Sequence, residues 1–342
     1  MKEIVFKTKL KWHKITHWEY WHSATLYFPL CFYLFYLALK ARSIGFFNAA
    51  NPSIIYGGLT LEGKKDIETL LPKEHNPISI LVKANTSKQA VLNLITENFR
   101  YPFIVKPNSG YRGKKVALIN NEAEFLTYYN NANFDFLLQE YIAYENEIGL
   151  FYCRKPNEFN GTITGIVYKV PITVIGDGKS TIGDLVFYNY RYHNQYETLF
   201  TDNEALKNTI LPFGEKYLLS TIGNHCRGSM FLDFSDKITP QLTDTINNYC
   251  KQINGFYFGR FDIKFNSWEE LEQGKNFKVI ELNGAGAEPT HIFDPKHSYF
   301  FALKEMAKHW KLMADIANVN KKLGAKYLGF WSAIKLRKKW KN

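Results

Sequence analysis

The chain has 342 residues, which is enough for one large domain or two ordinary domains with a sizeable core. Its formal net charge is +11 and 16% of its residues are aromatic, so an anionic partner is expected. The four cysteines form no CxxC motif and no Cys/His cluster, which excludes a recognisable zinc site and a disulfide framework and predicts reduced thiols in a cytoplasmic protein.

The excess positive charge is concentrated at the two ends of the chain. Residues 2–14 contain five lysines and one glutamate. Residues 321–342 contain eight Lys or Arg and no acidic residue, interleaved with Tyr327, Phe330, Trp331 and Trp340. Basic residues mixed with Trp and Phe suit an anionic lipid surface. Nucleic acid is the rival partner and a solvated tail the neutral alternative; we predict a membrane surface and no nucleic acid.

An apolar run near the N-terminus supports this interpretation. The stretch "SATLYFPLCFYLFYLAL", residues 23–39, has no charge across 17 residues, slightly short of the roughly 20 that a bilayer span needs. Pro29 should bend or interrupt a helix there. We predict a kinked or re-entrant helix in the cytoplasmic leaflet, hence a cytoplasmic protein that is peripheral or monotopic on the inner face of the cell membrane. A single span and a buried core helix are the alternatives.

From Ile78 onward the pattern is α/β. Alternating or continuously apolar runs predict strands at 78–83, 102–107, 116–119, 135–142, 147–153, 162–170, 256–265 and 277–283. Helical spacing and capping residues predict helices at 64–72, 87–99, 121–131, from Pro240 onward, and at 297–317.

One stretch imitates a phosphate-binding P-loop. Residues 174–181 read "VIGDGKST", but the motif needs a glycine where Thr173 stands. The sequence instead predicts an Asp-Gly turn after a strand, and a helix over 182–190 capped by Ser180 or Thr181.

Lysine, glycine and glutamate residues recur elsewhere in an order that suits a nucleotide. Lys106 ends a predicted strand, and Gly110 and Gly113 follow in the loop "NSGYRGKK". A cation beside mobile backbone N–H donors suits phosphate oxygens. Glu140 and Glu147 bracket a predicted hinge, "EYIAYENE". Its backbone can pair with an adenine edge, and a carboxylate can accept from ribose hydroxyls.

Hard oxygen ligands stand at the ends of two later strands. Asp262 lies in "FYFGRFDIKF", and Glu281 and Asn283 end "FKVIELN". This set suits Mg²⁺, which takes a few carboxylates together with phosphate oxygens. Arg260 lies one strand repeat from Asp262 and could neutralise charge on a transferred phosphoryl group.

The ordered set resembles the ATP-grasp superfamily, especially its D-alanine–D-alanine ligase-like and cyanophycin-synthetase-like carboxylate–amine ligases. The resemblance covers about residues 60–295 and is strongest at "PFIVKPNSGYRGKKV", "LLQEYIAYENE", "GRFDIKF" and "VIELNGAGAEPTH". The stretch containing "VIGDGKST" is similar to the corresponding part of cyanophycin-synthetase-like chains.

Carried over residue by residue, the resemblance implies an ATP site and a metal site. It implies phosphate contacts from Lys64, Lys106, Gly110 and Gly113, adenine contacts from Glu140, Tyr141 and Ile142, and a ribose contact from Glu147. It implies metal ligands at Asp262, Glu281 and Asn283, and contacts to the transferred phosphoryl group from Arg260, Arg227 and Lys169. Lys65 is a close rival of Lys64.

The resemblance implies an α/β (α+β) ATP-grasp fold of two subdomains that clasp ATP. We expect an N-terminal membrane-associated helical segment at 1–45, an N-terminal lobe at 46–120, a C-terminal lobe with the metal site at 121–318, and a basic aromatic tail at 319–342. Too few residues separate the apolar run from Lys64 for the complete Rossmann-like domain that the family usually has there. We therefore hypothesise that the membrane-facing segment replaces that domain.

The implied activity is that of a ligase (EC 6.3 type) with ATP and Mg²⁺ as cofactors, Mn²⁺ being the alternative metal. The substrate carboxylate becomes an acyl phosphate, and an amine then attacks it to give an amide. The substrates are expected to be small or lipid-linked carboxylates and amines. The alternatives are a phosphotransferase on a hydroxyl or carboxyl acceptor and a non-catalytic nucleotide-binding membrane protein.

Overall fold

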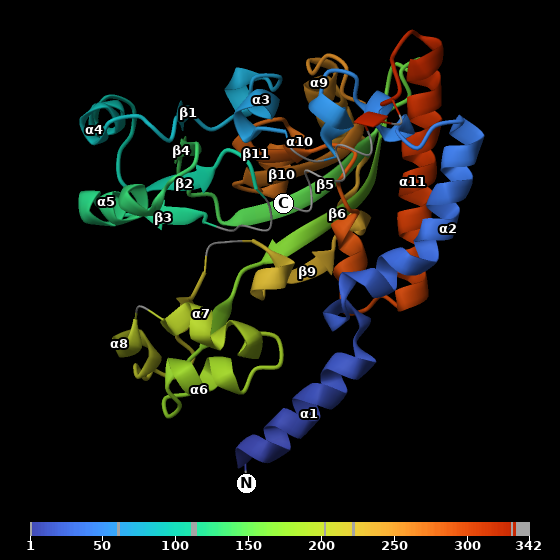
Figure 1. Ribbon diagram of the computed structural model, residues 1–342. Helices are drawn as coiled ribbons and strands as arrows, with labels where there is room; N and C mark the ends of the chain where they lie inside the picture. The colour runs from blue at the N-terminus through green and yellow to red at the C-terminus, as the bar shows by residue number, and fades with distance from the viewer. Residues whose placement is uncertain are drawn as a thin grey trace.

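The computed structural model describes residues 2–59, 62–110, 115–201, 203–220, 223–329 and 331–332. The described part contains a four-stranded sheet, a five-stranded sheet and a two-stranded ribbon, and every strand pair in them is antiparallel. Helices cover the sheets, and an N-terminal helical segment lies along the side of the molecule (Figure 1). The predicted α/β class with an apolar N-terminal helix is confirmed.

The smaller sheet has the order β1-β4-β2-β3. Its strands are β1 (Ser79–Val82), β4 (Phe136–Glu140), β2 (Phe103–Pro107) and β3 (Ala117–Ile119). Helices α4 (Lys88–Asn98) and α5 (Glu122–Asn131) bury apolar side chains against it. Ser87 caps α4 as predicted, since its side chain accepts from the backbone N–H of Ala90.

The larger sheet has the order β11-β10-β5-β6-β9. Its strands are β11 (Phe277–Asn283), β10 (Phe258–Phe265), β5 (Asn146–Cys153), β6 (Thr162–Val170) and β9 (Met230–Asp233). One face packs against α9 (Pro240–Lys251) and α10 (Trp268–Glu272), and the other against α11 (Tyr299–Lys322). Alternation along β10 sends Phe261 and Ile263 into the α9 core, which leaves Arg260 and Asp262 on the opposite face.

The N-terminal segment contains α1 (Lys2–Thr16), the 3₁₀ turn η1 (Trp18–Tyr20) and α2 (Ser23–Ala41). Helix α2 runs beside α11 (Figure 1) and buries Leu26 and Leu30 against it, with Pro29 inside the helix. Its outer face exposes Phe28 (69%) and Phe32 (71%). Within the described residues, α2 alone is long and apolar enough to cross a membrane, and 17% of its most apolar stretch is buried.

Residues between β6 and β9 form a small separate lobe below the larger sheet (Figure 1). It comprises β7 (Thr173–Ile175), α6 (Ile182–Phe187), α7 (Tyr196–Phe200), α8 (Glu204–Lys207) and β8 (Lys216–Leu218), around a core of its own. Short helical segments elsewhere are η2 (Phe46–Ala50), η3 (Ile55–Gly58), α3 (Lys64–Glu68), η4 (Lys73–His75), η5 (His193–Gln195), η6 (His225–Arg227), η7 (Ser235–Lys237) and η8 (Thr290–Phe293).

The false P-loop is a turn, as predicted. Asp177 accepts from the backbone N–H groups of Lys179 at 2.9 Å and Ser180 at 2.6 Å, and Gly178 has a positive φ of 72°. Thr181 then caps α6 in a reciprocal capping box with Asp184. The helix ends at Phe187 rather than at Tyr190, so the predicted length was too great.

Candidate active site

The site begins with the pairing of β10 and β11. Asp262 lies directly opposite Glu281, and Arg260 directly opposite Asn283. Directly paired residues of antiparallel strands project from the same face of the sheet, with Cβ atoms about 5 Å apart. The structure therefore brings the three predicted metal ligands and the predicted phosphoryl-binding arginine together on the face opposite α9.

A buried ion network surrounds Asp262. Lys169 Nζ from β6 lies 2.9 Å from one carboxylate oxygen, and Arg260 Nε lies 2.9 Å from the other. The same lysine donates to Glu147 Oε1 at 2.8 Å. Burial alone would raise the pKa of Asp262, but the two cations outweigh it and lower that pKa. Gly149 makes room for this packing, because a Cβ there would lie 3.2 Å from the Arg260 side chain.

Two further lysines approach from the side of the smaller sheet. Lys106 Nζ donates to the carbonyl of Ile280 at 3.2 Å, next to Glu281, and burial lowers the pKa of Lys106 to about 8. Lys64 Nζ donates to the carbonyl of Gly110 at 2.7 Å and lies 3.7 Å from Glu281 Oε1. Lys65 instead donates to Glu68 and Ser79, so Lys64 is the lysine that faces the group.

The predicted adenine hinge joins the two sheets, since it lies between β4 and β5. Glu140 Oε2 accepts from the backbone N–H of Ile78 at 3.1 Å. Lys264 Nζ donates to the carbonyls of Ile142 at 3.2 Å and Tyr144 at 3.1 Å, and it lies 5.6 Å from the centre of the Tyr141 ring. These bonds hold the hinge backbone against β10.

The two glycine-containing loops are described in part. Gly110 has a positive φ of 135°, while Gly113 lies outside the described residues. Arg227 ends η6, on a loop whose Gly223 packs against Glu147: a Cβ on that glycine would lie 2.8 Å from the Glu147 carboxylate and 3.0 Å from the Lys169 side chain. The loop of Arg227 therefore borders the ion network.

The side chains around Asp262 offer few donors to a metal ion. Within the described residues, no group of three or more His, Cys, Asp or Glu side chains is arranged to hold a metal ion. Both oxygens of Asp262 already face cations, and Asn283 has a buried side-chain nitrogen with no hydrogen-bond partner among the described residues. Two carboxylates and one amide suit only a cation that brings further oxygen ligands, such as phosphates, with it.

Two carboxylates of this region were missed in the sequence. Burial raises the pKa of Glu62, against an opposing effect of Lys64, and one oxygen of Glu62 is buried without a partner in the described part of the chain. Burial raises the pKa of Glu288 to about 7, and its carboxylate accepts from the hydroxyl of Tyr27 on α2. The stretch "GAGAEPTH" was part of the resemblance to the ATP-grasp superfamily, but that resemblance gave no role to its glutamate, Glu288.

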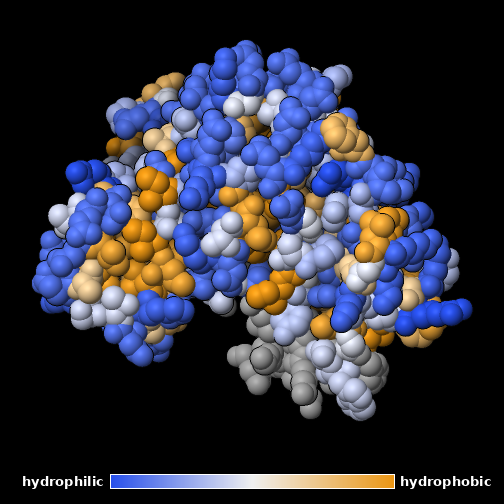
Figure 2. Space-filling view, turned by 90° about the horizontal axis from the view of Figure 1, so that it is seen from above, coloured by the Kyte–Doolittle hydropathy of each residue, from blue (hydrophilic) through white to orange (hydrophobic). Residues whose placement is uncertain are grey.

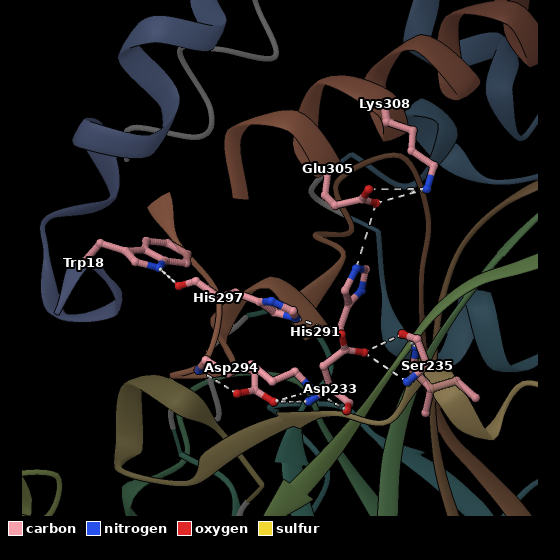
Figure 3. Close-up of polar contacts among 10 residues, drawn as sticks. Trp18, Asp233, Ser235, His291, Asp294, His297, Glu305 and Lys308 are labelled. Carbon is pink, nitrogen blue, oxygen red and sulfur yellow. Dashed lines mark hydrogen bonds and ion pairs between the residues drawn. The ribbon is translucent and has the colours of Figure 1, made fainter. Parts of the chain in front are cut away.

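A polar cluster fixes the end of the connection that follows β11 (Figure 3). His297 Nε2 lies 2.7 Å from Asp233 Oδ2, and its carbonyl accepts from the Trp18 indole N–H at 2.8 Å. His291 of η8 points toward Glu305 of α11 (Figure 3), with 3.9 Å between the ring nitrogen and the carboxylate. The cluster thus ties η8 to β9, to α11 and to the N-terminal segment.

No family model matches the chain. A curated protein does: the glutathione biosynthesis bifunctional protein GshAB of Clostridium perfringens (strain 13 / Type A) is 26% identical over 216 residues, which are 56% of this chain and 27% of that protein. The chain is similar to ATP-grasp carboxylate–amine ligases. The predicted resemblance is thereby confirmed. Because the chain spans only about a quarter of the length of this ATP-grasp relative, its own activity is a proposal.

Solved structures give the same class of neighbour. A bifunctional glutathione synthetase from Pasteurella multocida is 15% identical, with a TM-score of 0.40, over 76% of this chain and 38% of that chain. The D-alanine–D-alanine ligase from Bacillus anthracis is 14% identical, with a TM-score of 0.42, over 77% and 69%. The VanG D-Ala:D-Ser ligase from Enterococcus faecalis is 12% identical, with a TM-score of 0.42, over 75% and 61%.

Proposed function

We propose that the chain is an ATP-dependent carboxylate–amine ligase. The observation that carries this proposal is the convergence of cations from both sheets on the β10–β11 pair. Four cationic side chains (Lys64, Lys106, Lys169 and Arg260) surround three carboxylates (Glu147, Asp262 and Glu281). A surplus of partly desolvated cations suits a polyphosphate, whose charge they would balance. The sequence similarity to GshAB supports the same conclusion.

The roles follow from where each residue lies. Lys106 and Lys64 would hold the inner phosphates beneath the loop at Gly110, and the hinge at 140–142 would hold the adenine. Glu147 would accept from the ribose after Lys169 turns from it toward the phosphates. The transferred phosphoryl group would be held by Lys169, Arg260 and Arg227.

The donor set at β10 and β11 fits a magnesium ion that arrives with ATP. Asp262, Glu281 and the Asn283 side-chain oxygen would hold it, and Mn²⁺ would fit the same oxygen donors. The ion would supply charge neutralisation on the phosphates. The lysines and Arg260 would position the nucleotide.

The reaction that we propose has two steps. The carboxylate oxygen of one substrate attacks the γ-phosphorus, and the bond to the β-phosphate oxygen breaks, giving an acyl phosphate and ADP. The nitrogen of an amine then attacks the acyl carbon, phosphate leaves, and the amine loses a proton. The products are an amide, ADP and inorganic phosphate.

The test is a screen of carboxylates and amines with the full chain and Mg-ATP, scored by ADP release. The proposal requires ADP release that depends on both substrates, and its loss in Glu281→Gln and Asn283→Ala. Glu270→Gln, which removes an exposed carboxylate of α10, is the matched control and should keep full activity. Phosphate retained on a product without an amine would identify a phosphotransferase. ATP binding without turnover would identify a non-catalytic nucleotide-binding protein.

We further propose that the enzyme acts at the cytoplasmic face of a membrane, on amphipathic or lipid-linked substrates. Helix α2 supports this, because Phe28, Phe32 and Phe35 recur at helical spacing on its exposed side. Viewed from above, the surface is largely hydrophilic and its hydrophobic residues lie in separate patches (Figure 2). Lys40 lies in the last turn of α2 and Arg42 follows the helix, and both could meet lipid phosphates.

Flotation with phosphatidylglycerol-containing vesicles tests the membrane proposal. The double variant Phe28→Ser/Phe32→Ser should bind the vesicles at least about tenfold more weakly, because each ring would lose apolar burial. The control is Phe159→Ser/Phe213→Ser, which removes two rings from other parts of the surface that are more exposed than Phe28 and Phe32. Equal binding by both doubles, or no binding by the unaltered chain, would contradict the proposal.

A further inference from the structure

The connection between β11 and η8 contains a carboxylate that none of the roles above uses. Glu288 lies five residues after Asn283, and its backbone carbonyl accepts from Arg260 Nη1 at 3.3 Å. Arg260 in turn holds Asp262, so this part of the connection borders the ion network. The Glu288 side chain accepts from the Tyr27 hydroxyl of α2.

The surroundings of this carboxylate are poor in compensating charge. Loss of water around Glu288 raises its pKa to about 7, and no charged neighbour contributes to the shift. The ion pairs among the described residues do not include it. A half-buried carboxylate with one neutral hydrogen-bond donor is unfavourable, and a cation is the partner that would offset this.

Two polar atoms at the two ends of this connection also lack partners among the described residues. The Asn283 side-chain nitrogen and the Thr290 hydroxyl are buried and make no hydrogen bond within the described part of the chain. Thr290 is 7% exposed. Leaving such atoms unpaired costs about 1–3 kcal/mol each, so they suit a ligand that supplies the missing bonds.

Backbone contacts keep the connection compact. The N–H of Ala285 donates to the carbonyl of Gly57, and that of Gly286 to the carbonyl of Gly58, both at 2.9 Å. Gly284 has no room for a side chain, since a Cβ would lie 2.5 Å from the Gly57 carbonyl. The connection is thus held between η3 on one side and Tyr27 of α2 on the other.

We propose that Glu288, oriented by the Tyr27 hydroxyl, binds the primary ammonium group of the amine substrate, so that α2 forms a wall of the acceptor subsite. This inference rests on the proposed ligase function and gives it an acceptor class. Glu288 would hold the amine beside Arg260, and Tyr27 is a positioning residue. The N-terminal segment would complete the subsite.

The experiment measures binding of n-butylammonium chloride to the full chain with Mg-ATP, by ligand-observed NMR at pH 8 and constant ionic strength. n-Butanol is the control ligand, because it has the same apolar chain without the charge. The dissociation constant for n-butylammonium should be at least tenfold higher in Glu288→Gln and intermediate in Tyr27→Phe, with n-butanol unchanged. Glu270→Gln should behave as the unaltered chain does.

Equal n-butylammonium affinity in the unaltered chain and Glu288→Gln would overturn the inference, as would an absence of saturable binding to the unaltered chain. Unchanged ATP affinity in Glu288→Gln shows that this variant is folded. If its ATP affinity is lost, the n-butylammonium affinity of Tyr27→Phe decides whether the inference holds. The ligase function is tested separately by the ADP-release screen. Glu288-dependent ammonium binding without amine-dependent ADP release would reject the ligase and leave an ammonium site. Amine-dependent ADP release without Glu288-dependent ammonium binding would reject only the proposed subsite.

Discussion

Lys106 lies in the candidate phosphate site, whereas Lys179 lies in the stretch that only resembles a P-loop. Lys106 is buried beside Glu281 with its pKa lowered to about 8, whereas Lys179 lies in an exposed turn that Asp177 closes. We expect Lys106→Ala to weaken ATP binding by about 2 kcal/mol or more, because a charge-assisted bond to phosphate is lost. Lys179→Ala should leave it unchanged. Calorimetric titration with Mg-ATP measures both, and a similar loss in the two variants would refute the placement of the site.

Glu288 also gives a prediction about stability. Its pKa is about 7 in the folded chain against 4.5 as the ordinary value, so folding favours the protonated form. The stability that the protonated Glu288 carboxyl contributes is complete below about pH 4.5 and is lost as the pH rises through 7. Glu288→Gln cannot ionise, and it should therefore gain up to about 3 kcal/mol relative to the unaltered chain between pH 5 and pH 8.5. Urea unfolding at both pH values measures the difference, and a difference that does not change with pH would argue against a buried Glu288 carboxyl.

At the residue scale, the sequence predicted contacts that regular structure dictates. Alternation along β10 was sufficient to place Arg260 and Asp262 on one face, whereas the direct opposition of Asp262 and Glu281 needs the register of the two strands. The Tyr27–Glu288 bond joins residues 261 positions apart and depends on how α2 packs, which no local pattern encodes. The pairing of Lys169 with Asp262 likewise needs the order of the strands in the sheet.

At the scale of elements, strands and helices with strong periodicity were predicted well. The small lobe between β6 and β9 was not, because its helices are too short to show a period; α8 is only Glu204–Lys207. It depends on turn and cap chemistry instead. A cap at Ser180 or Thr181 was predicted from the sequence, whereas the reciprocal bond from Asp184 and the early end of α6 at Phe187 were not.

The capping box should be measurable. Thr181 accepts from the backbone N–H of Asp184 at 3.0 Å, and the Asp184 side chain reaches back to the N–H of Thr181. Thr181→Ala should lower the free energy of unfolding by about 1 kcal/mol, because an N–H group at the start of α6 loses its acceptor. Thr127→Ala, in the interior of α5, is the control and should change it little. Chemical denaturation followed by circular dichroism compares the two, and equal effects would contradict a role for the cap.

The two faces of α2 should respond oppositely to mutation. Leu30 is 5% exposed and packs in the cluster that contains Ile292 and Met306, whereas Phe32 is 71% exposed. Leu30→Ala should cost about 2–5 kcal/mol through cavity formation, while Phe32→Ala should change stability by less than about 0.5 kcal/mol. Thermal unfolding measures both. A small effect of Leu30→Ala would show that α2 is not part of the folded core, and that it could be removed without loss of stability.

At the scale of the whole molecule, the two sheets meet at the hinge that follows β4. The division at residue 120 stays a prediction, although β4 (Phe136–Glu140) pairs with β1 and β2, so that a division by sheet would fall between Glu140 and Asn146. The cations of the site come from both sides of that hinge.

The charge of the chain gives the last prediction. Five of the eight cations in residues 321–342 lie between 335 and 341, and the net charge of the chain is +11. Cations near an anionic bilayer contribute about 1 kcal/mol each, and salt screens them with a Debye length of about 8 Å at physiological strength. Vesicle binding should therefore weaken steeply between low and high salt when phosphatidylglycerol is present. With phosphatidylcholine alone, only the salt-insensitive part from the α2 rings should remain. Flotation across a salt series measures both, and salt-independent binding to anionic vesicles would show that the basic ends take no part.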